Sequence, residues 1–552
     1  MKTLQGIRVI DVSQNLAGPQ CTQILGDLGA DVIKVEPLSG DPARAWGPPF
    51  WEGEAPLFLS GNRNKRSIAL DLKSGGGRQV LERLIESADI FVQSFRKGVI
   101  ESLGFGHEKL RARRPELIYA SITGFGAEGP LSETPGYDPL IQAYSGIMSL
   151  TGHPDGPPAR VGGAVVDIGT GMWTALGILA ALRERDQTGR GTHVESSLLA
   201  TALVWISYHL TGYLAGGELP LRAGSGFSMV APYEAFPTQD GELMILAGND
   251  GIFVRLCEAL AIPEVAADPR FATNPDRVSH RQALTAILAS HTRKQTTADL
   301  RALLEKHRVP CSPIQDVSQV VRDPQVAAAG ILDPVPHPRI PNYREVAFPI
   351  RFDGERPQPS RPAPQPGEHT SEILTELNYT PAQIQTLVDE RCVSPDRALL
   401  QQLPKLTMKI LILCTGNSCR SQMAEGLLRS LDPRLDVQSA GTHPSTQVNP
   451  NAIRVMQEIG VDISKGSPKN VDAFLNQPID YVITVCGDAE QNCPVFGGRV
   501  GKRLHIGFPD PANAAGTEQQ ILQVFRECRD NIKTRFTELY EKELRSKLNA
   551  KT

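Results

Sequence analysis

The sequence predicts an α/β chain with largely parallel sheets, and three observations support that prediction. Short β-rich runs alternate with helix-like segments over the first 200 residues, as expected for strands linked by crossover helices. The same alternation starts again at Met408 with the apolar run KILILC. With 552 residues, the chain is long enough for three or four structural units. We therefore expect a large α/β part followed by a smaller one.

The first elements form a strand–helix–strand unit at residues 6–12, 18–30 and 31–36. Glu36 ends the second strand, a position that is typical of dinucleotide-binding folds. The phosphate fingerprint G-x-G-x-x-G is absent from the first loop, however, so we do not expect NAD. Further strands, helices and a hairpin are predicted, in chain order, at 67–72, 76–88, 89–95, 116–126, 167–184, 193–197 and 233–248.

Composition and charge exclude several classes of protein. A net charge of −4 argues against nucleic-acid binding, which usually needs a basic face. The chain starts without an apolar signal core, and His209 with several Ser and Thr residues interrupts the most apolar stretch, 198–214. We predict a buried helix there rather than a membrane span. Nine cysteines, an odd and small number, argue against a secreted disulfide scaffold. These features predict a soluble, cytoplasmic protein.

The smaller part carries the most specific motif, Cys414-Thr-Gly-Asn-Ser-Cys-Arg420, between a predicted strand and a predicted helix. Backbone N–H groups and the helix N-terminus should bind an oxyanion in this loop and lower the pKa of the Cys414 thiol. Arg420 offers a planar two-pronged donor for a phosphate-like group. The alternative is a chance Cys-x5-Arg. The residues expected to cradle the anion are Thr415, Gly416, Asn417, Ser418, Cys419 and Ser421, with Gly416 and Asn417 suited to positive-φ bends.

Two further features lie downstream of this loop. Asp510-Pro511 places a carboxylate where it could act as a general acid, although an ordinary Asp-Pro turn has the same sequence. Cys486 and Cys493 follow another predicted strand, and on residues alone they could be a reactive pair, a metal pair or unrelated thiols. No other cluster supplies further zinc ligands at the usual spacing, so we expect no metal.

With these residues, 408–552 resembles the thioredoxin-coupled arsenate reductases, which have the low-molecular-weight tyrosine phosphatase fold. The matching segments are CTGNSCRSQMAEG (414–426), SAGTHP (439–444), the pair Cys486/Cys493 and DPA (510–512). The resemblance implies that Cys414 attacks arsenate, that Arg420 holds it and that Asp510 protonates the leaving hydroxide. Cys486 would then attack Cys414 and release arsenite, and Cys493 would take over the disulfide for reduction by thioredoxin. Ser421 would stabilise the Cys414 thiolate.

A tyrosine phosphatase is the alternative, because it shares the nucleophile, the arginine and the general acid. A phosphatase has no use for the Cys486/Cys493 relay, and its Asp-Pro is typically followed by tyrosines, whereas Ala512 and Asn513 follow here. Some reductases of this type bind potassium near Asn417, Glu425 and Ser439. Here Lys469 stands where a carboxylate often lies, which argues against potassium.

In the larger part, the candidate catalytic residue is Asp167, in GGAVVDIGTGMW at the start of a long apolar helix. A carboxylate in such apolar surroundings could act as a nucleophile or base, and the alternative is that Asp167 only caps the helix. The basic cluster Arg63, Lys65 and Arg66 could bind phosphates or form a solvated turn.

This part resembles the class III coenzyme A transferases, the formyl-CoA and carnitine-CoA transferase group. The matching segments are 16–36, 62–72, 136–152, 165–182, 188–199 and 366–379. Because the last one overlaps the end of the proline-rich stretch 355–370 and continues beyond it, we place that stretch inside the first domain. The predicted domains are therefore 1–398 and 408–552, joined by a linker at 399–407.

The resemblance implies a large Rossmann-like domain, a small domain and an interlocked homodimer. Asp167 would attack an acyl-CoA, pass through an anhydride to an aspartyl-CoA thioester, and return coenzyme A to an incoming carboxylic acid. Coenzyme A would be a substrate, with no tightly bound cofactor. Racemases of the family pair this aspartate with a preceding histidine. That histidine is missing near Gly136 here, which favours transfer over racemisation. Leu16 stands where formyl-CoA enzymes carry a glutamine, which argues against oxalate and formate as substrates. We expect coenzyme A to contact Asn64, Lys65, Arg66, Ser94, Phe95, Arg96, Tyr137 and Asp138.

The sequence thus predicts a bifunctional enzyme, a coenzyme A transferase fused to an arsenate reductase. The alternative from another class is that one of the two parts has lost catalysis and serves as a redox or binding unit.

Overall fold

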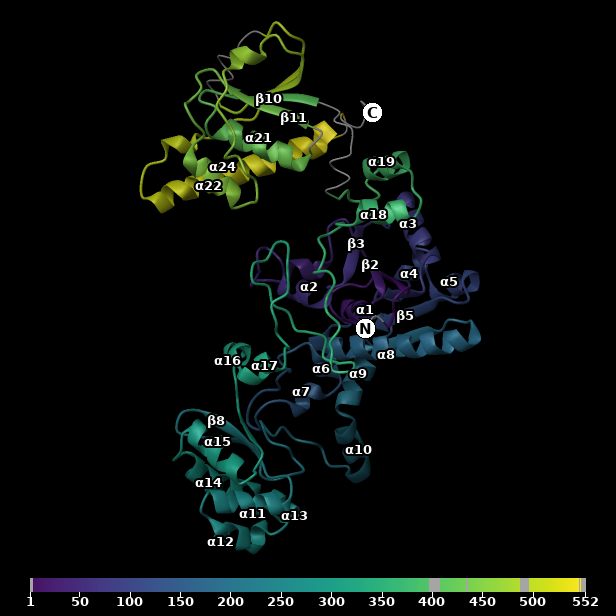
Figure 1. Cartoon of the computed structure of the whole chain (residues 1–552), viewed down its shortest axis with the longest axis vertical. Coiled ribbons are helices and arrows are strands. Elements are labelled where there is room, and N and C mark those ends of the chain that lie inside the picture. The colour runs from purple at the N-terminus through teal and green to yellow at the C-terminus, as the bar shows by residue number, and fades with distance from the viewer. Residues whose placement is uncertain (1–2, 397–407, 433–434, 487–495, 546, 548–552) are drawn as a thin grey trace. The chain divides into compact units, whose positions relative to one another are not determined.

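The computed structural model describes residues 3–396, 408–432, 435–486, 496–545 and 547. The chain divides into two units (Figure 1). The first consists of Met1–Leu377 with Cys392–Ser394, and the second of Asn378–Arg391 with Pro395–Thr552. The predicted linker at 399–407 lies outside the described residues.

In its described part, the first unit contains a parallel six-stranded sheet with the strand order β3-β2-β1-β4-β5-β6. Its central strands β1 and β4 are buried almost throughout, and apart from polar residues at the strand ends their residues are apolar. The order reverses between β1 and β4, and in such sheets a crevice forms at the carboxyl ends of these two strands. The strands are β1 (Arg8–Asp11), β2 (Asp31–Glu36), β3 (Lys65–Ala69), β4 (Ile90–Gln93), β5 (Ile118–Thr123) and β6 (His193–Ser197).

Helices of the first unit connect these strands and pack on the sheet. The long helix α8 packs against α1 through Gly171, where an added Cβ would lie 2.6 Å from the carbonyl oxygen of Ala17. α8 is long and apolar enough to cross a membrane, as the core helix of a soluble protein also is, and half of its apolar window is buried. The helices are α1 (Ala17–Asp27), α2 (Pro56–Gly61), α3 (Gly75–Glu86), α4 (Val99–Ser102), α5 (His107–Arg113), α6 (Asp138–Tyr144), α7 (Ile147–Leu150) and α8 (Val165–Thr188).

The prediction of one buried helix over 198–214 is wrong. The segment forms two helices, α9 (Leu198–Trp205) and α10 (Ser207–Gly216), with a 66° bend between them. α10 buries none of its residues in this chain, and Leu214 is 83% exposed. Apolar composition alone therefore misled the prediction, because it does not say what covers a helix.

A smaller part of the first unit contains the predicted hairpin, β7 (Tyr233–Pro237) and β8 (Glu242–Leu246), joined by β9 (Cys311–Pro313). The chain then returns toward the large sheet, where the Asn64 side chain accepts a hydrogen bond of 2.7 Å from the Ser360 N–H. The proline-rich stretch 355–370 thus lies in the first unit. The remaining helices of this unit are α11 (Asp250–Ala259), α12 (Pro263–Ala267), α13 (Asn274–Ser279), α14 (Arg281–Thr292), α15 (Thr297–Lys306), α16 (Val317–Arg322), α17 (Pro324–Ala328) and α18 (Thr370–Glu376).

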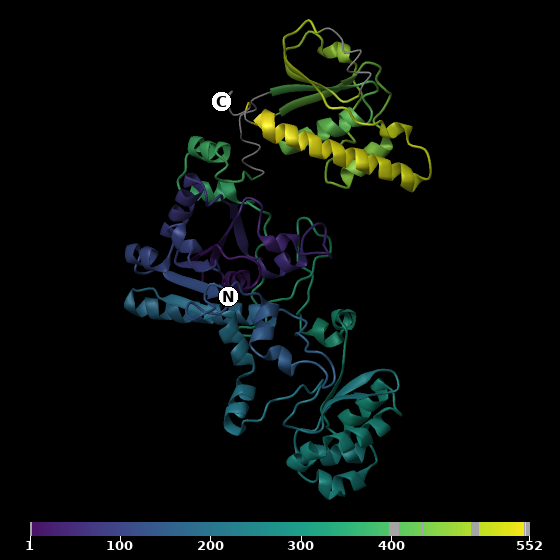
Figure 2. The ribbon, with the colours of Figure 1, turned by 180° about the vertical axis from the view of Figure 1, so that it is seen from behind.

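In the described part of the second unit, a parallel four-stranded sheet has the order β11-β10-β12-β13. The long helix α24 and the helix α21 pack together on this sheet (Figure 2). The elements are α19 (Pro381–Asp389), β10 (Met408–Cys414), α21 (Arg420–Leu431), β11 (Leu435–Gly441), α22 (Pro450–Gln457), β12 (Ile479–Thr484), β13 (Val500–His505) and α24 (Glu518–Leu539). The predicted α/β class and parallel sheets are confirmed in both units.

Candidate functional sites

A cavity of about 820 Å³ opens in the first unit at the carboxyl ends of its central strands. The loops after β1, β4 and β5 contribute to its wall together with Leu198, the residue directly after β6, as expected for a ligand site at a strand-order reversal. Its polar and charged lining includes Gln14, Asn15, Ser94, Arg96, Lys97, Thr123, Ser132, Glu133, Thr134, Asp138, Arg160 and Asp167.

Asp167 lies in the first turn of α8 and lines this cavity. It does not cap the helix, so that alternative is wrong. The cap comes from Asp138, whose Oδ2 accepts hydrogen bonds from the N–H groups of Val166 at 2.8 Å and Asp167 at 3.2 Å. Within the described chain, the Asp167 carboxylate itself makes no hydrogen bond. It is therefore available to react with a ligand.

Burial raises the pKa of the Asp167 carboxyl to about 7, and the negative charge of Asp138 adds to the effect. Below pH 4 the group is protonated in the folded and the unfolded chain. Between pH 4 and pH 7 the folded chain holds the extra proton, so this group makes the fold less stable as pH rises.

We expect Asp167→Asn to increase the free energy of unfolding of the first unit by roughly 1–3 kcal/mol at pH 8, and to change it little at pH 4. Tryptophan fluorescence during denaturation measures this unit alone, because all four tryptophans lie within residues 46–205. An equal effect of the substitution at both pH values would contradict the raised pKa.

Two glycines bring separate segments of the cavity wall together. A Cβ on Gly136 would lie 2.3 Å from the Cα of Gly124, so neither position has room for a side chain. Gly124 follows β5, and Gly136 precedes the Tyr137–Asp138 pair. This close approach fixes the backbone that carries Asp138, and hence the cap of α8.

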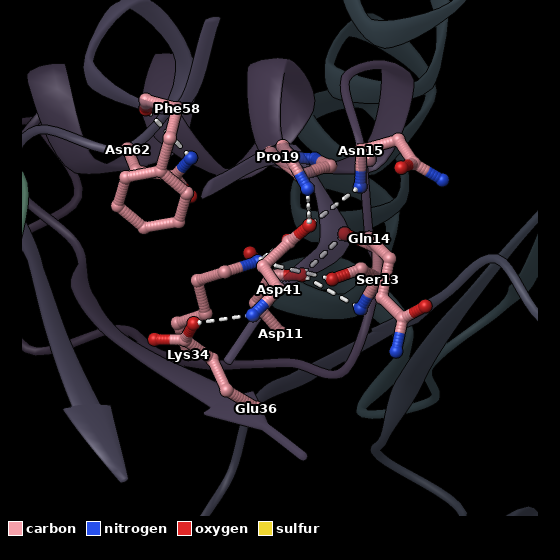
Figure 3. Close-up of polar contacts among 12 residues, drawn as sticks. Asp11, Ser13, Gln14, Asn15, Pro19, Lys34, Glu36, Asp41, Phe58 and Asn62 are labelled. Carbon is pink, nitrogen blue, oxygen red and sulfur yellow. Dashed lines mark hydrogen bonds and ion pairs between the residues drawn. The ribbon is translucent and has the colours of Figure 1, made fainter. Parts of the chain in front are cut away.

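A buried network of charges lies next to the loop after β1 (Figure 3). The Lys34 ammonium pairs with Asp41 at 2.7 Å, and the Lys65 ammonium pairs with Asp11 at 3.1 Å. All four side chains are almost completely buried. Burial lowers the pKa of Lys65 to about 8, against the opposing charge of Asp11. Such a network needs every partner, because an unpaired buried charge is strongly destabilising.

The carboxylates of this network bind backbone N–H groups of the loop after β1 and so fix that loop. Asp11 accepts from the N–H of Ser13 at 3.0 Å, and Asp41 accepts from the N–H of Asn15 at 3.2 Å. Between them, the N–H of Gln14 donates to the Ser94 hydroxyl at 3.2 Å. Figure 3 shows the carboxamides of Gln14 and Asn15 turned away from the Lys34–Asp41 pair, and both residues line the cavity.

The structure brings five of the eight predicted coenzyme A contacts to the cavity, namely Ser94, Phe95, Arg96, Tyr137 and Asp138. Asn64, Lys65 and Arg66 do not line the cavity, and other residues of the unit bind their side chains. Arg66 pairs with Asp31, Glu372 and Glu376, and Asn64 donates to Asp27. Arg63 is also buried and pairs with Asp27, so the basic cluster is not a solvated turn.

Glu36 has no free acceptor for a ribose. Arg44 binds both of its carboxylate oxygens at 2.7 and 2.8 Å, and the Ser67 hydroxyl adds a hydrogen bond of 2.7 Å. This agrees with the missing dinucleotide fingerprint.

In the second unit, the loop from Cys414 to Arg420 curls between β10 and α21. The carbonyl oxygens of Cys414, Thr415, Gly416 and Ser418 accept hydrogen bonds from N–H groups of residues 442–449. Within the described chain, the N–H groups of Thr415, Gly416, Ser418, Cys419 and Arg420 have no partner. Their arrangement fits an oxyanion cradle at the N-terminus of α21.

Hydrogen bonds also hold the Cys414 sulfur. It lies 2.9 Å from the Ser421 hydroxyl and accepts from the N–H of Asn417 at 3.1 Å. The Asn417 amide donates to the Ser421 oxygen at 2.9 Å, which leaves the Ser421 hydrogen for the sulfur. Asn417 has the expected positive φ, 48°, whereas Gly416 does not.

The expectation of a lowered pKa for Cys414 is wrong in this structure. Burial raises the pKa of the thiol, and it outweighs the hydrogen bonds from Ser421 and Asn417 and the charge of Arg420. The nearby Cys486 thiol adds to the rise.

The other predicted residues of this site lie around the same loop. Arg420 forms an ion pair with Asp510 and donates to the carbonyl of Phe508 at 3.0 Å. The Cys486 sulfur lies 3.5 Å from the Thr415 hydroxyl, at the edge of the loop. Cys493 lies outside the described residues.

The residues expected near potassium do not fit that ion. The Glu425 carboxylate pairs with Arg429 at 2.9 Å and with the Lys469 ammonium at 3.6 Å, and it also accepts from the Ser439 hydroxyl. Over the described ranges, no group of three His, Cys, Asp or Glu residues is placed to hold a metal ion.

Sequence reasoning missed several residues of the first cavity, among them Gln14, Asn15, Lys97 and Arg160. A usable signal existed for Arg160, a single cation in the Gly- and Val-rich segment that leads to Asp167. No local signal marked the other three, because strand order brings their loops together.

Comparison with known proteins gives a match for each unit. Residues 4–370 match the model of CoA-transferase family III, and residues 409–550 match that of the low molecular weight phosphotyrosine protein phosphatases. A succinate–glutarate CoA-transferase of Agrobacterium fabrum is 42% identical over 388 residues, which cover 68% of this chain and 95% of that protein.

Two solved structures match different parts of the chain. The crystal structure of a CAIB/BAIF family protein from Brucella suis is 41% identical, with a TM-score of 0.62 over 68% of this chain and 99% of that one. An arsenate reductase in the phosphate binding state is 34% identical, with a TM-score of 0.22 over 24% of this chain and 97% of that one.

Proposed function

The chain belongs to CoA-transferase family III, and we propose that its first unit transfers coenzyme A between two carboxylic acids through Asp167. The observation that carries the proposal is the Asp167 carboxylate, which faces the cavity while Asp138 caps α8 in its place. A nucleophile needs such a free, partly desolvated group.

In the proposed cycle, an Asp167 oxygen attacks the acyl-CoA carbonyl, and the carbon–sulfur bond breaks to give an aspartyl anhydride and CoA thiolate. The thiolate then attacks the Asp167 carbonyl, which releases the first acid as its carboxylate and leaves an aspartyl-CoA thioester. The incoming carboxylate reverses these two steps and leaves as the new acyl-CoA. Each step ends with a free carboxylate or thiolate, so no outside base or oxidant is needed.

We propose that the acids are dicarboxylic. The relative from Agrobacterium fabrum is named for succinate and glutarate, and cations line the cavity here. Arg96 and Lys97, next to Phe95, are suited to the phosphates of coenzyme A, with the aromatic ring beside them.

We also propose that the chain acts as a cytoplasmic homodimer. Large apolar side chains are exposed along α8, α9 and α10 of the single chain, more than a soluble monomer usually shows. They are Ile168, Met172, Trp173, Leu176, Leu203, Val204, Trp205, Tyr208, Leu210, Tyr213 and Leu214.

For the second unit, we propose reduction of arsenate to arsenite with thioredoxin as the final reductant. Cys414 attacks arsenic with loss of hydroxide, which Asp510 protonates. Cys486 attacks the Cys414 sulfur, the sulfur–arsenic bond breaks with its electron pair on arsenic, and arsenite leaves as a Cys414–Cys486 disulfide forms. Cys493 attacks Cys486, and thioredoxin reduces the resulting disulfide. The position of Cys486 beside Thr415 supports this over a phosphatase, which uses Cys414, Arg420 and Asp510 alone.

The Cys493→Ser variant separates the two activities. We expect it to release one arsenite per chain and then stop as a Cys414–Cys486 disulfide, because no thiol remains to resolve it. Non-reducing peptide mapping by mass spectrometry measures this trapped bond. Repeated turnover of arsenate by the variant would contradict the relay, and unchanged hydrolysis of p-nitrophenyl phosphate with no arsenite would favour the phosphatase.

A further inference from the structure

Three cationic side chains line the cavity that contains Asp167, and they come from two segments of the chain. Arg96 and Lys97 follow β4, and the Lys97 ammonium donates to the carbonyl of Ala127 at 2.9 Å. Arg160 lies instead on the segment that leads into α8, seven residues before Asp167. It thus belongs to the same segment as the reacting carboxylate.

Hydrogen bonds connect the backbone next to Arg160 to that of Asp167. The N–H of Val161 donates to the side-chain oxygen Oε1 of Gln142 at 2.9 Å, and the side-chain Nε2 of Gln142 donates to Oδ1 of Asp138 at 2.6 Å. The other oxygen of Asp138 accepts from the N–H of Asp167 at 3.2 Å. Gln142 is completely buried and Asp138 almost so. Gln142 and Asp138 therefore fix the backbone at the two ends of the segment 160–167 relative to each other.

The guanidinium of Arg160 has little to bind within the protein. Among the described residues, its one hydrogen bond is a long contact of 3.5 Å to the carbonyl of Val161, and it forms no ion pair. In contrast, Arg63 and Arg66 of the same unit are paired with carboxylates. A planar guanidinium with free N–H groups in a cavity matches a carboxylate through two parallel hydrogen bonds.

We infer that Arg160 binds the second, unreacting carboxylate of a dicarboxylic acid while the first carboxylate reacts at Asp167. The inference rests on the proposed transferase function and assigns the residue that selects dicarboxylic over monocarboxylic acids. The hydrogen bonds through Gln142 and Asp138 fix the backbone beside Arg160 relative to that of Asp167. Arg96 and Lys97 remain for the phosphates of coenzyme A.

The test compares glutarate with its monoamide, glutaramate, which has nearly the same shape but a neutral far end. With saturating succinyl-CoA as donor, we expect wild-type kcat/KM to favour glutarate by about 10- to 100-fold, the usual weight of a hydrogen bond to a charged group. Arg160→Met should remove this preference, mainly by raising KM for glutarate, and Arg160→Lys should restore part of it. The matched variant Lys97→Met should raise KM for succinyl-CoA and keep the preference.

A wild type without preference, or an Arg160→Met variant that keeps it, would overturn the inference. An equal loss of kcat/KM for glutarate and glutaramate in both Arg160→Met and Arg160→Lys would also overturn the inference. Such a result would mean that Arg160 supports the structure and does not select the acid. Failure of the transferase proposal looks different, because the wild type would then transfer coenzyme A to neither acid.

Discussion

Replacement of Asp167 by alanine should abolish coenzyme A transfer, with a loss in kcat of at least about 10⁴-fold. A nucleophile that forms a covalent intermediate cannot be replaced by water or by a neighbouring group without losing most of the rate. Asp138, the nearest other carboxylate, has both oxygens occupied by the N–H groups of α8 and the Gln142 amide. It therefore cannot take over the role.

The measurement is the rate of glutaryl-CoA formation from succinyl-CoA and glutarate. Asp167→Asn is the matched control for shape, and it should be as inactive as the alanine variant, because the amide lacks a nucleophilic oxygen anion. Both variants should keep the tryptophan fluorescence of the folded first unit. A residual rate above a tenth of the wild type would show that the transfer does not pass through Asp167.

Replacement of Cys414 by serine should abolish arsenite release, again by at least about 10⁴-fold. The hydroxyl of serine is far less acidic than a thiol, and it cannot form the disulfide with Cys486 that ends the reduction. Burial already raises the pKa of the Cys414 thiol. The rate of the wild type should consequently increase with pH as more thiolate forms.

Cys528→Ser provides a matched control in the same unit. Cys528 is buried, and its sulfur contacts the carbonyl of Pro509 at 3.8 Å behind the Asp510 loop. Burial raises its pKa to about 11, so it should remain an unreactive thiol. We expect near wild-type arsenite release from this variant, measured with thioredoxin and its reductase. Activity in Cys414→Ser equal to that of Cys528→Ser would remove Cys414 from the mechanism.

Local pattern was enough to predict most of the fold. The β-rich runs at 6–12, 31–36 and 89–95 became neighbouring strands, and the segment after Met408 became a new sheet. These elements are short apolar runs in a sheet buried on both faces, and such runs keep the same structure in most surroundings. The apolar segment 198–214 has no such constraint, and its bend and exposure were not predictable.

The sites were predictable where one short motif contains the chemistry. The Cys414–Arg420 loop is such a motif, since strand, loop and helix follow each other directly. Asp138 as the cap of α8, and Lys65 as the partner of Asp11, depend on residues 29 and 54 positions away. Long-range partners of this kind leave no local pattern, which is why the basic cluster was expected to face solvent or ligand.

The most direct test of the central claim follows oxygen atoms. Glutarate labelled with ¹⁸O in its carboxylates is incubated with succinyl-CoA and the full chain, and the peptide that contains Asp167 is analysed by mass spectrometry. When the labelled acid leaves as glutaryl-CoA, one of its oxygens should stay on Asp167, because the anhydride breaks on the glutaryl side. Labelled glutaryl-CoA with no ¹⁸O in that peptide would contradict transfer through Asp167.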